Sequence, residues 1–410
     1  MKMTKLALIP GVLACLSAGV ATAQTQYAAP AKPVEFNMAT VTFTVYGDFD
    51  EYLNYMRSSS GSHLFALEDG AFLRTRLGLK GLKDVGDGYY MKFVLEQGLY
   101  SDNGAPNDST YASNFGTTGR LFDRQAWAGV DTPYGEFRAG RQNSAIFFRG
   151  DYVDFTTRTL GSPVNSFNGV VPSRYDSDIS YISHRIEGFW FEAHYSFAGS
   201  VPNDSTKQKV YQAALEYLNG PYRLGYAGIE LAGAPAKLTA AQPANFHEPN
   251  IYYHMFYGNY EYLPGSKIYL TFIHSNDGSG TLGSTGNLPT FTTGTGNNTV
   301  SSTVPYNPDH YRIYSVSADY RIVPKVRMGG VYGRIEDTSA DNRNANLWVV
   351  GAYYDVWRDT ILYGLVDAII NGHQAGFAPN GSAGLQTKFS AADVVGQSIR
   401  GVQVGFVYRF

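Results

Sequence analysis

Positively charged side chains recur at every second position in several segments of the chain. Arg74, Arg76 and Lys80 alternate with Leu77 and Leu79. Further charged residues that alternate with apolar ones are Lys92, Glu96 and Arg138. Because a guanidinium stays protonated at every relevant pH, a surface that collects these arginines carries a permanent positive charge. Such a surface attracts anions.

Motifs for catalysis or cofactor binding are weak. Residues 278–283 fit the GxGxxG pattern, but the Thr-, Gly- and Asn-rich stretch at 284–299 does not read as a helix that could hold a pyrophosphate at its N-terminus. His184 beside Ser183 is the best hydrolase candidate, yet no GxSxG elbow accompanies it and no HExxH pair occurs. The acidic turn at 84–87 is expected to be solvated. We therefore expect no enzyme activity, no cofactor and no metal.

The composition excludes several classes of protein. Net charge is −3 and 16% of residues are charged, so nothing points to nucleic-acid binding through counterion release. The single cysteine, Cys15, rules out an internal disulfide. No stretch after Gln24 approaches the ~20 apolar residues that a membrane helix needs.

The first residues predict export. Lys2 and Lys5 precede the apolar run 6–20, and Ala21-Thr22-Ala23 supplies small residues for cleavage. We predict a signal peptide over 1–23 and a mature chain over 24–410. A lipoprotein reading of Cys15 fits less well, because the apolar run continues past it.

Alternation with a period of two residues dominates the rest of the chain. Phe189, Phe191 and Tyr195 alternate with Glu192 and His194, and the final segment from Val402 to Phe410 follows the same rule. Such segments of about ten residues predict β-strands with one apolar face. We count about sixteen of them, the second beginning at Leu73.

Short and long connections follow one another in turn. The expected short turns are 84–88, 131–135, 219–221, 263–265, 323–325 and 358–360, and the long polar loops include 100–119, 232–248, 275–309 and 371–397. All short turns then fall at one end of an antiparallel sheet. Because hydrocarbon cannot satisfy an open sheet edge, the pattern predicts an all-β, closed transmembrane barrel with short periplasmic turns and long extracellular loops. The 32 Tyr and 24 Phe would supply aromatic girdles. A soluble β-sandwich or β-solenoid should show fewer strands per domain or a fixed repeat.

Several segments carry a family resemblance. They are 44–50, 76–81 followed by 84–88, 124–130 followed by 134–142, 353–363 and the ending 404–410. In this order they resemble the general, non-specific porins of Gram-negative bacteria, in the branch typical of β-proteobacteria.

The resemblance implies a homotrimer in the outer membrane, surrounded by lipid and lipopolysaccharide. Each barrel would form a water-filled channel for passive diffusion of small hydrophilic solutes. The third long loop, here about 143–174, would fold into the lumen and narrow it. Tyr408 and Phe410 resemble the signal by which barrel-assembly machinery accepts its clients.

Barrel geometry assigns a direction to the charges. An arginine on the lipid face at mid-depth costs roughly 2 to 4 kcal/mol, so the alternating charges should face the lumen. The direction of Arg124 follows from the resemblance. The expected pore-lining residues are Arg74, Arg76, Lys80, Lys92, Glu96, Arg124, Arg138, Arg141, Arg149, Asp151, Asp154 and Arg158.

We expect a modest anion preference from these residues. Five of them, here named the wall arginines, are Arg74, Arg76, Arg124, Arg138 and Arg141, and they oppose only two loop aspartates. Alternatively, several arginines pair with Glu96, Asp151 and Asp154 and only hold the loop. A channel specific for sugars or small organic anions is the second functional candidate, since Tyr46, Tyr253 and Tyr257 could line the lumen.

Overall fold

The computed structural model describes residues 34–38, 40–106, 121–157, 159–167, 173–197, 209–232, 251–277, 309–338, 343–381, 384–385 and 389–410. The predicted signal peptide 1–23, Arg158 and the GxGxxG segment 278–283 lie outside the described residues.

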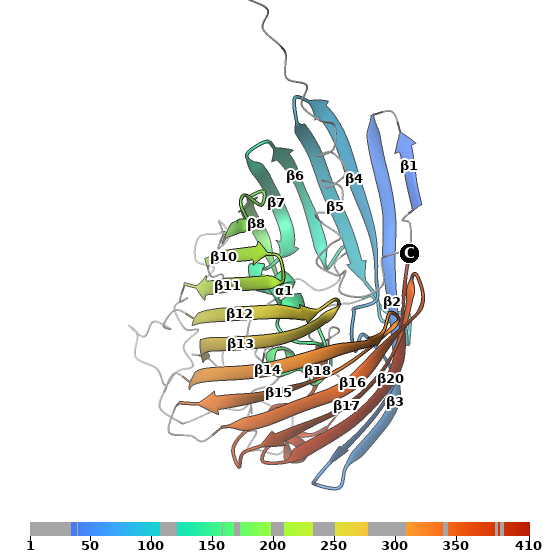
Figure 1. Cartoon of the computed structure of the whole chain (residues 1–410), viewed down its shortest axis with the longest axis vertical. Helices are drawn as coiled ribbons and strands as arrows, with labels where there is room; N and C mark the ends of the chain where they lie inside the picture. Colours follow the sequence, from blue (N-terminus) through green and yellow to red (C-terminus); the bar gives the residue numbers. More distant parts are fainter. Residues whose placement is uncertain are drawn as a thin grey trace, which may run out of the picture.

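Sixteen antiparallel strands form a closed wall, with neighbours in chain order (Figure 1). They are β2 (Val41–Ser58), β4 (Arg76–Gly86), β5 (Tyr89–Gly98), β6 (Gln125–Thr132), β7 (Gly135–Asn143), β8 (Arg174–Ile182), β9 (Phe189–Ser196), β10 (Val210–Asn219), β11 (Tyr222–Leu231), β12 (Ile251–Leu263), β13 (Ser266–Asp277), β14 (Asp309–Val323), β15 (Val326–Asp337), β16 (Ala345–Trp357), β17 (Thr360–Asn371) and β20 (Ser398–Arg409). The last strand pairs with the first, Asp48 lying opposite Arg409, so the ring of sixteen strands is closed. The predicted barrel of about sixteen strands is confirmed.

Two strands, β3 and β4, share the place next to β2 in the wall. β3 (His63–Asp69) pairs with the second half of β2 and β4 pairs with its first half. Between them, the Asp50 carboxylate accepts hydrogen bonds from the amides of Phe72 and Leu73, at 2.7 and 2.5 Å. The strand expected from Leu73 therefore begins at Arg76, because a side chain takes the amides that a ladder would use. A further short strand, β1 (Val34–Met38), pairs with Val41–Val45 of β2.

The two faces of the wall differ in chemistry. On β20 the side chains of Val402, Val404 and Phe406 are exposed, whereas Gln403 is buried. On β9 the side chains of Phe189 and Phe191 are exposed, whereas those of Glu192 and His194 are buried. The outer face is therefore apolar and the inner face polar, as lipid outside requires.

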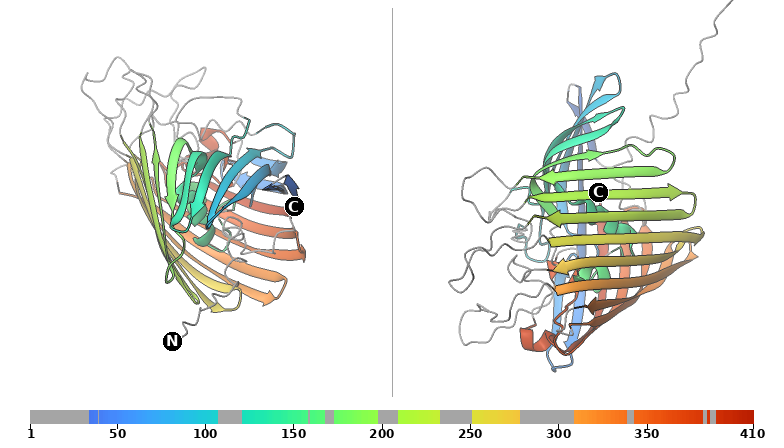
Figure 2. Two further views of the ribbon diagram at one scale, coloured as in Figure 1. Left: turned by 90° about the horizontal axis from the view of Figure 1, so that it is seen from above. Right: turned by 90° about the vertical axis from the view of Figure 1, so that its left-hand side faces the viewer.

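The connections sort by length, as predicted. Six of the seven short turns hold two residues, and the seventh, between β8 and β9, holds six, 183–188. At the β4–β5 turn, Gly86 and Gly88 have φ of 94° and 80°, which only glycine adopts at little cost. The strands lie side by side, so these turns share one end of the barrel (Figure 2).

Short helices accompany the wall. They are α1 (Ala145–Arg149), the 3-10 helix η3 (Gly150–Tyr152), α2 (Pro163–Phe167) and α3 (Ala391–Val394). In addition, β18 (Asn380–Gly381) and β19 (Gly384–Leu385) form a small hairpin. In the described part of the chain no helix is long and apolar enough to cross a membrane.

The segment between β7 and β8 packs on the concave side of the wall (Figure 1). α1 contacts β9, β10 and β11, and α2 contacts β14 and β15. Ile146, Val153 and Val164 join a buried apolar cluster with Ala214 and Ile229 of the wall. Burial of these side chains therefore fixes the segment against the inner face.

Candidate functional site: charged residues of the inner face

The wall arginines stand beside carboxylates. Nε of Arg76 lies 2.5 Å from Asp48, and Nε of Arg124 lies 2.7 Å from Glu96. The remaining pairs are Arg138 with Glu136 and Arg141 with Asp176, each at 2.7 Å, and Arg74 with Asp69 at 3.7 Å. No wall arginine has a side chain more than 8% exposed. Their positive charge is thus largely compensated within the wall itself.

The two lysines predicted to line the lumen have different neighbours. Nζ of Lys92 lies 2.7 Å from Asp131 and 3.2 Å from Glu136. Lys80 lies instead over the Tyr46 ring, 4.3 Å from its centroid.

Local backbone shape positions the Glu96 carboxylate. The Tyr46 ring crosses over β4 at Gly78, where a Cβ would approach its Cζ to 2.2 Å. The Tyr46 hydroxyl can therefore donate to Glu96 at 2.8 Å, while Arg124 donates to the other carboxylate oxygen. Glycine at position 78 is needed for this close approach.

One of the two loop aspartates is directed into the loop itself. Asp154 is fully buried and accepts hydrogen bonds from the amide and hydroxyl of Thr156 and from the Ser162 hydroxyl. These short-range bonds shape the loop itself. Asp151, in η3, is half-buried.

The predicted residue Arg149 belongs to a second group of charges. Its Nη1 lies 3.5 Å from the Glu216 carboxylate of β10. The same carboxylate accepts hydrogen bonds from Arg185, from Arg223 at 2.9 Å and from the Tyr257 hydroxyl at 2.9 Å. We call Glu216 and the three arginines the Glu216 cluster.

Three guanidiniums thus share one fully buried carboxylate. Side chains of Arg185 and Arg223 are 32% and 19% exposed, well above those of the wall arginines. Arg149 stacks over Trp190 at 4.2 Å and Arg223 over Tyr152 at 3.7 Å. The Glu216 cluster therefore presents positive charge beside aromatic rings and remains partly accessible to water.

Arg149 stays protonated and charged, and Tyr152 stays neutral. Burial alone lowers the pKa of Arg149, but Tyr257, Glu192 and Glu216 outweigh it and raise that pKa above its usual value. Burial raises the pKa of Tyr152, so its hydroxyl stays neutral. Arg149 is therefore a fixed positive charge.

A histidine lies close to the Glu216 cluster along the wall. Nδ1 of His194 is 2.6 Å from Asp178 and its Nε2 is 2.7 Å from Glu192. An imidazolium can donate to both carboxylates at once.

Backbone anchors hold the loop between β7 and β8 to the wall. Asn259 donates to the Tyr152 carbonyl at 3.1 Å and Thr271 to the Val153 carbonyl at 2.9 Å. Arg327 donates to the Phe155 carbonyl at 2.6 Å. Each bond satisfies a carbonyl that irregular backbone would otherwise leave unpaired.

Comparison with known proteins identifies the family. The sequence profile of the Gram-negative porins matches residues 11–374. The chain belongs to this family. An outer membrane porin protein of Bordetella pertussis is 30% identical over 183 residues, which cover 41% of this porin and 44% of that protein. The major outer membrane protein P.IB of Neisseria meningitidis serogroup A is 25% identical over 195 residues, or 46% and 54% of the two chains. The matched stretches therefore span about half the length of these curated relatives.

Solved structures share the porin fold. The anion-selective porin from Comamonas acidovorans superposes with a TM-score of 0.69 at 17% identity, over 90% of this porin and all of that chain. Salmonella typhi OmpF gives a TM-score of 0.59 at 15% identity, over 92% and 100%. The family and the relatives' names place this porin in the outer membrane of a Gram-negative bacterium.

Other predicted sites in the porin have separate structural partners. Ser183 accepts the Phe191 amide at 2.8 Å, whereas His184 lies 2.9 Å from Asp131. Phe410 exchanges two backbone hydrogen bonds with Gly47, at 3.0 and 3.1 Å. No group of three residues able to hold a metal ion occurs within the described ranges.

Sequence reasoning missed most of the Glu216 cluster in this porin. Glu216 alternates with Leu215 and Tyr217, so its inward direction was predictable from the strand period. Arg223 follows directly on the next strand of the hairpin. Their meeting with Arg149 depends on the path of a loop 67 positions away, which carries no periodic signal.

Proposed function

We propose that this porin forms a water-filled channel for passive diffusion of small hydrophilic solutes and ions across the outer membrane, with a modest preference for anions. The closed wall, apolar outside and charged inside, supports a channel rather than an enzyme. The single observation that carries the anion preference is the sharing of one carboxylate by three arginines in the Glu216 cluster.

The wall arginines contribute less to this preference in our proposal. Each lies beside a carboxylate that serves at most two cations, Asp48 being shared with Arg409 and Glu136 with Lys92, whereas Glu216 serves three. In the Glu216 cluster two positive charges remain after Glu216 is counted, although the Asp178, His194 and Glu192 group nearby offsets part of them. The fold likeness to a porin named as anion-selective agrees with this sign.

We further propose that segment 143–174 narrows the channel. Its support is the set of bonds from Asn259, Thr271 and Arg327 to its backbone. These bonds hold the segment on the concave side of the wall, where it occupies cross-section that solutes would otherwise use.

Reversal potentials in planar bilayers test the ion preference. With a tenfold KCl gradient we expect a potential whose sign shows that chloride is more permeant. A reversal potential of the opposite sign, which shows that potassium is more permeant, would overturn the proposal. A reversal potential of zero would assign the arginines to a structural role.

A channel for small organic anions is the second candidate. Tyr152 and Trp190 lie against arginines of the Glu216 cluster, an arrangement that suits a carboxylate on an apolar body. Liposome swelling with neutral and anionic solutes of increasing size separates the two candidates. A smooth decline with size supports a general channel, and fast entry of one anion out of size order supports a specific one.

Assembly follows the same family pattern in our proposal. An OmpT chain of Vibrio cholerae with the same fold is described in a trimer form. We propose a homotrimer here, which should give conductance in three equal steps.

We also propose that the barrel-assembly machinery recognises Tyr408 and Phe410. Phe410→Ala should therefore lower assembly in cells more than it lowers refolding in detergent.

A further inference from the structure

The connection between β17 and β20 folds back onto the inner face of the barrel. It comprises residues 372–397, of which the structure describes 372–381, 384–385 and 389–397. Phe377 is fully buried and packs edge-on against the Tyr311 ring of β14, with 6.0 Å between the ring centroids. It belongs to the apolar cluster that also contains Ile335 of β15. The connection therefore covers part of the inner face at the end of the barrel where the long connections lie, which for this fold is the extracellular end.

The same connection contacts the loop between β7 and β8. Its short strand β18 lies against α2 of that loop. Ala378, two residues before β18, is only 2% exposed. Two long connections thus lie one against the other inside the barrel, and both occupy cross-section of the lumen.

Asn371, the last residue of β17, ties the two arms of the connection together. Its Nδ2 lies 2.9 Å from the Phe377 carbonyl oxygen of the first arm and 3.1 Å from the Val394 carbonyl oxygen of the second. In addition, the Gly396 amide donates to the Ala375 carbonyl at 2.9 Å. The two arms are therefore expected to move as one body.

A single carboxylate fastens the second arm to the turn between β2 and β3. Oδ1 of Asp393 in α3 accepts hydrogen bonds from the Ser60 and Ser62 hydroxyls, both at 2.7 Å. Ser390, which lies in the same arm as Asp393, donates its amide and its hydroxyl to Oδ2. Hydrogen bonds from Ser390, Ser60 and Ser62 lower the pKa of Asp393, so its carboxylate stays ionised. We call Asp393, Ser60 and Ser62 the Asp393 latch.

The latch and the buried arm differ in how water competes with their contacts. Ser60 is exposed and Ser62 is half-buried, so water can replace their hydrogen bonds to Asp393 at little net cost. Phe377 would instead have to leave an apolar cluster, which is unfavourable. Gly396 has φ of 70° between α3 and β20, a conformation that favours glycine at the base of the second arm. The latch is therefore the attachment that opens most readily, and burial of Phe377 keeps the open state rare.

We propose that residues 372–397 form a movable lid at the extracellular mouth and that the Asp393 latch holds this lid closed. When Ser60 and Ser62 release Asp393, both arms move away from the inner face together and the mouth widens. This proposal rests on the proposed channel activity and adds a way in which the width of the channel changes.

Thiol modification measures the position of the lid without any current. Cys15 lies in the predicted signal peptide, so Ala378→Cys places a buried thiol in a mature chain that has no other cysteine. A water-soluble methanethiosulfonate reagent should modify this thiol slowly in the folded porin. We expect Asp393→Ala to raise the rate of modification by about tenfold, because local opening becomes more frequent.

Two sets of serine variants separate a latch from a helix cap. Ser60→Ala with Ser62→Ala removes the hydroxyls that reach Asp393 from the β2–β3 turn, and it should raise the rate of modification nearly as much as Asp393→Ala. Ser390→Ala also removes a hydroxyl from Asp393, but within the same arm, and it should leave the rate almost unchanged. Resistance of the barrel to unfolding in sodium dodecyl sulfate reports whether each variant has folded.

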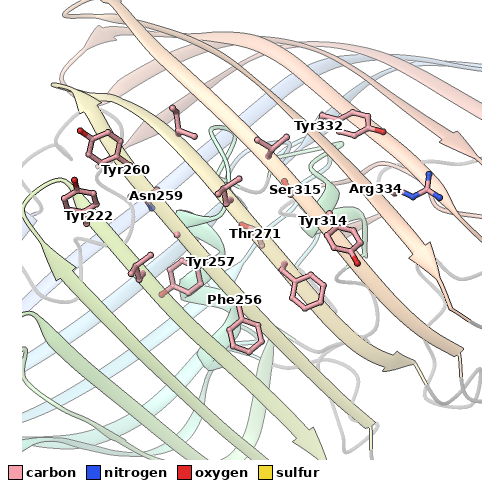
Figure 3. A pocket seen from close by; sticks show the side chains of 16 residues that line it. Tyr222, Phe256, Tyr257, Asn259, Tyr260, Thr271, Tyr314, Ser315, Tyr332 and Arg334 are labelled. Atoms are coloured by element: carbon pink, nitrogen blue, oxygen red, sulfur yellow. The ribbon is translucent and has the colours of Figure 1, made fainter.

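Single-channel conductance measures the consequence for the channel. Asp393→Ala should add an open level larger than that of the unmodified porin. Tyr332→Phe is the control, because it removes a hydroxyl that donates to the Asn346 side chain at 3.0 Å on the outward face of β15 (Figure 3). It should change neither the conductance nor the rate of thiol modification.

Three outcomes are decisive. Equal rates of modification in S60A/S62A and S390A would assign Asp393 to the capping of α3 and overturn the latch. Faster modification in D393A without a larger open level would overturn the lid, since its movement would leave the width of the channel unchanged. A porin that passes no current but shows the expected pattern of modification would refute the channel and still support the latch.

Discussion

Two groups of arginines on the inner face differ in how far neighbouring carboxylates compensate their positive charge. The wall arginines each have a carboxylate partner and are nearly fully buried. The three arginines of the Glu216 cluster share one carboxylate, and two of them are partly exposed. The difference teaches that counting arginines does not predict selectivity, because a buried arginine beside a carboxylate presents less net charge to an ion in the lumen than three arginines around one carboxylate.

The largest expected effect comes from Glu216→Gln. This change leaves three guanidiniums around a neutral amide, and removal of one partner from a buried ionic group costs about 3 to 5 kcal/mol. We expect a lower urea midpoint for unfolding and a stronger anion preference in the molecules that fold. Glu230→Gln, on the outward face of β11, is the control and should change neither. An unchanged urea midpoint for Glu216→Gln would show that the arginines have other adequate partners.

Arg185→Ser with Arg223→Ser should shift ion selectivity toward cations. Two unit charges at about 8 Å in water together contribute roughly 1 kcal/mol, or about fivefold in the occupancy of an anion. The reversal potential in a KCl gradient measures the shift. The matched control removes one wall pair, Glu96→Gln with Arg124→Gln, and should leave the potential nearly constant. A larger shift in the control would reverse the roles assigned to the two groups.

Thr271→Val should loosen the loop without altering any charge. It removes the hydroxyl that donates to the Val153 carbonyl, at a cost of about 1 kcal/mol. We expect a slightly lower unfolding midpoint and noisier single-channel current, while the reversal potential stays the same. Thr44→Val, in the half-buried first part of β2, is the comparison variant. Unchanged current noise with a lower midpoint would mean that this bond stabilises the wall but does not hold the loop.

The smallest expected effect is the response to pH. Because the pKa of Arg149 is raised, this residue stays protonated throughout the accessible range, and so do the other arginines of the Glu216 cluster. Anion selectivity should therefore be constant from about pH 5 to about pH 9. Reversal potentials across this range provide the measurement. A change of the reversal potential with a midpoint inside this pH range would assign the selectivity to a histidine. His194→Asn would then abolish that pH-dependent change.

The sequence predicts the barrel well because its signal is periodic. Strand direction, the outward course of Val402, Val404 and Phe406, and the order of short and long connections all follow from a period of two and from turn chemistry. The break before Arg76 escapes prediction, since it depends on Asp50 accepting amide hydrogen bonds from residues more than twenty positions away.

For the charged residues of the inner face, the sequence predicts the direction of the side chains but not their ion pairs. Inward direction follows from alternation, and it holds for Arg76 and Glu96. Pairing does not follow, because it needs the register between strands and the path of the loop. Arg76 meets Asp48 through the register of β2 with β4, whereas Arg149 reaches Glu216 only because the loop crosses the inner face.

The loop that carries Arg149 also has a mechanical consequence. Its backbone or side chains bond to Gln212 of β10, Asn259 of β12, Ser317 of β14 and Tyr353 of β16, and Leu160 donates to the Ala71 carbonyl. A segment fastened at so many points acts as an internal brace. Flattening of the barrel under lateral pressure from the bilayer would have to break several of these hydrogen bonds, so the loop stabilises the barrel from within.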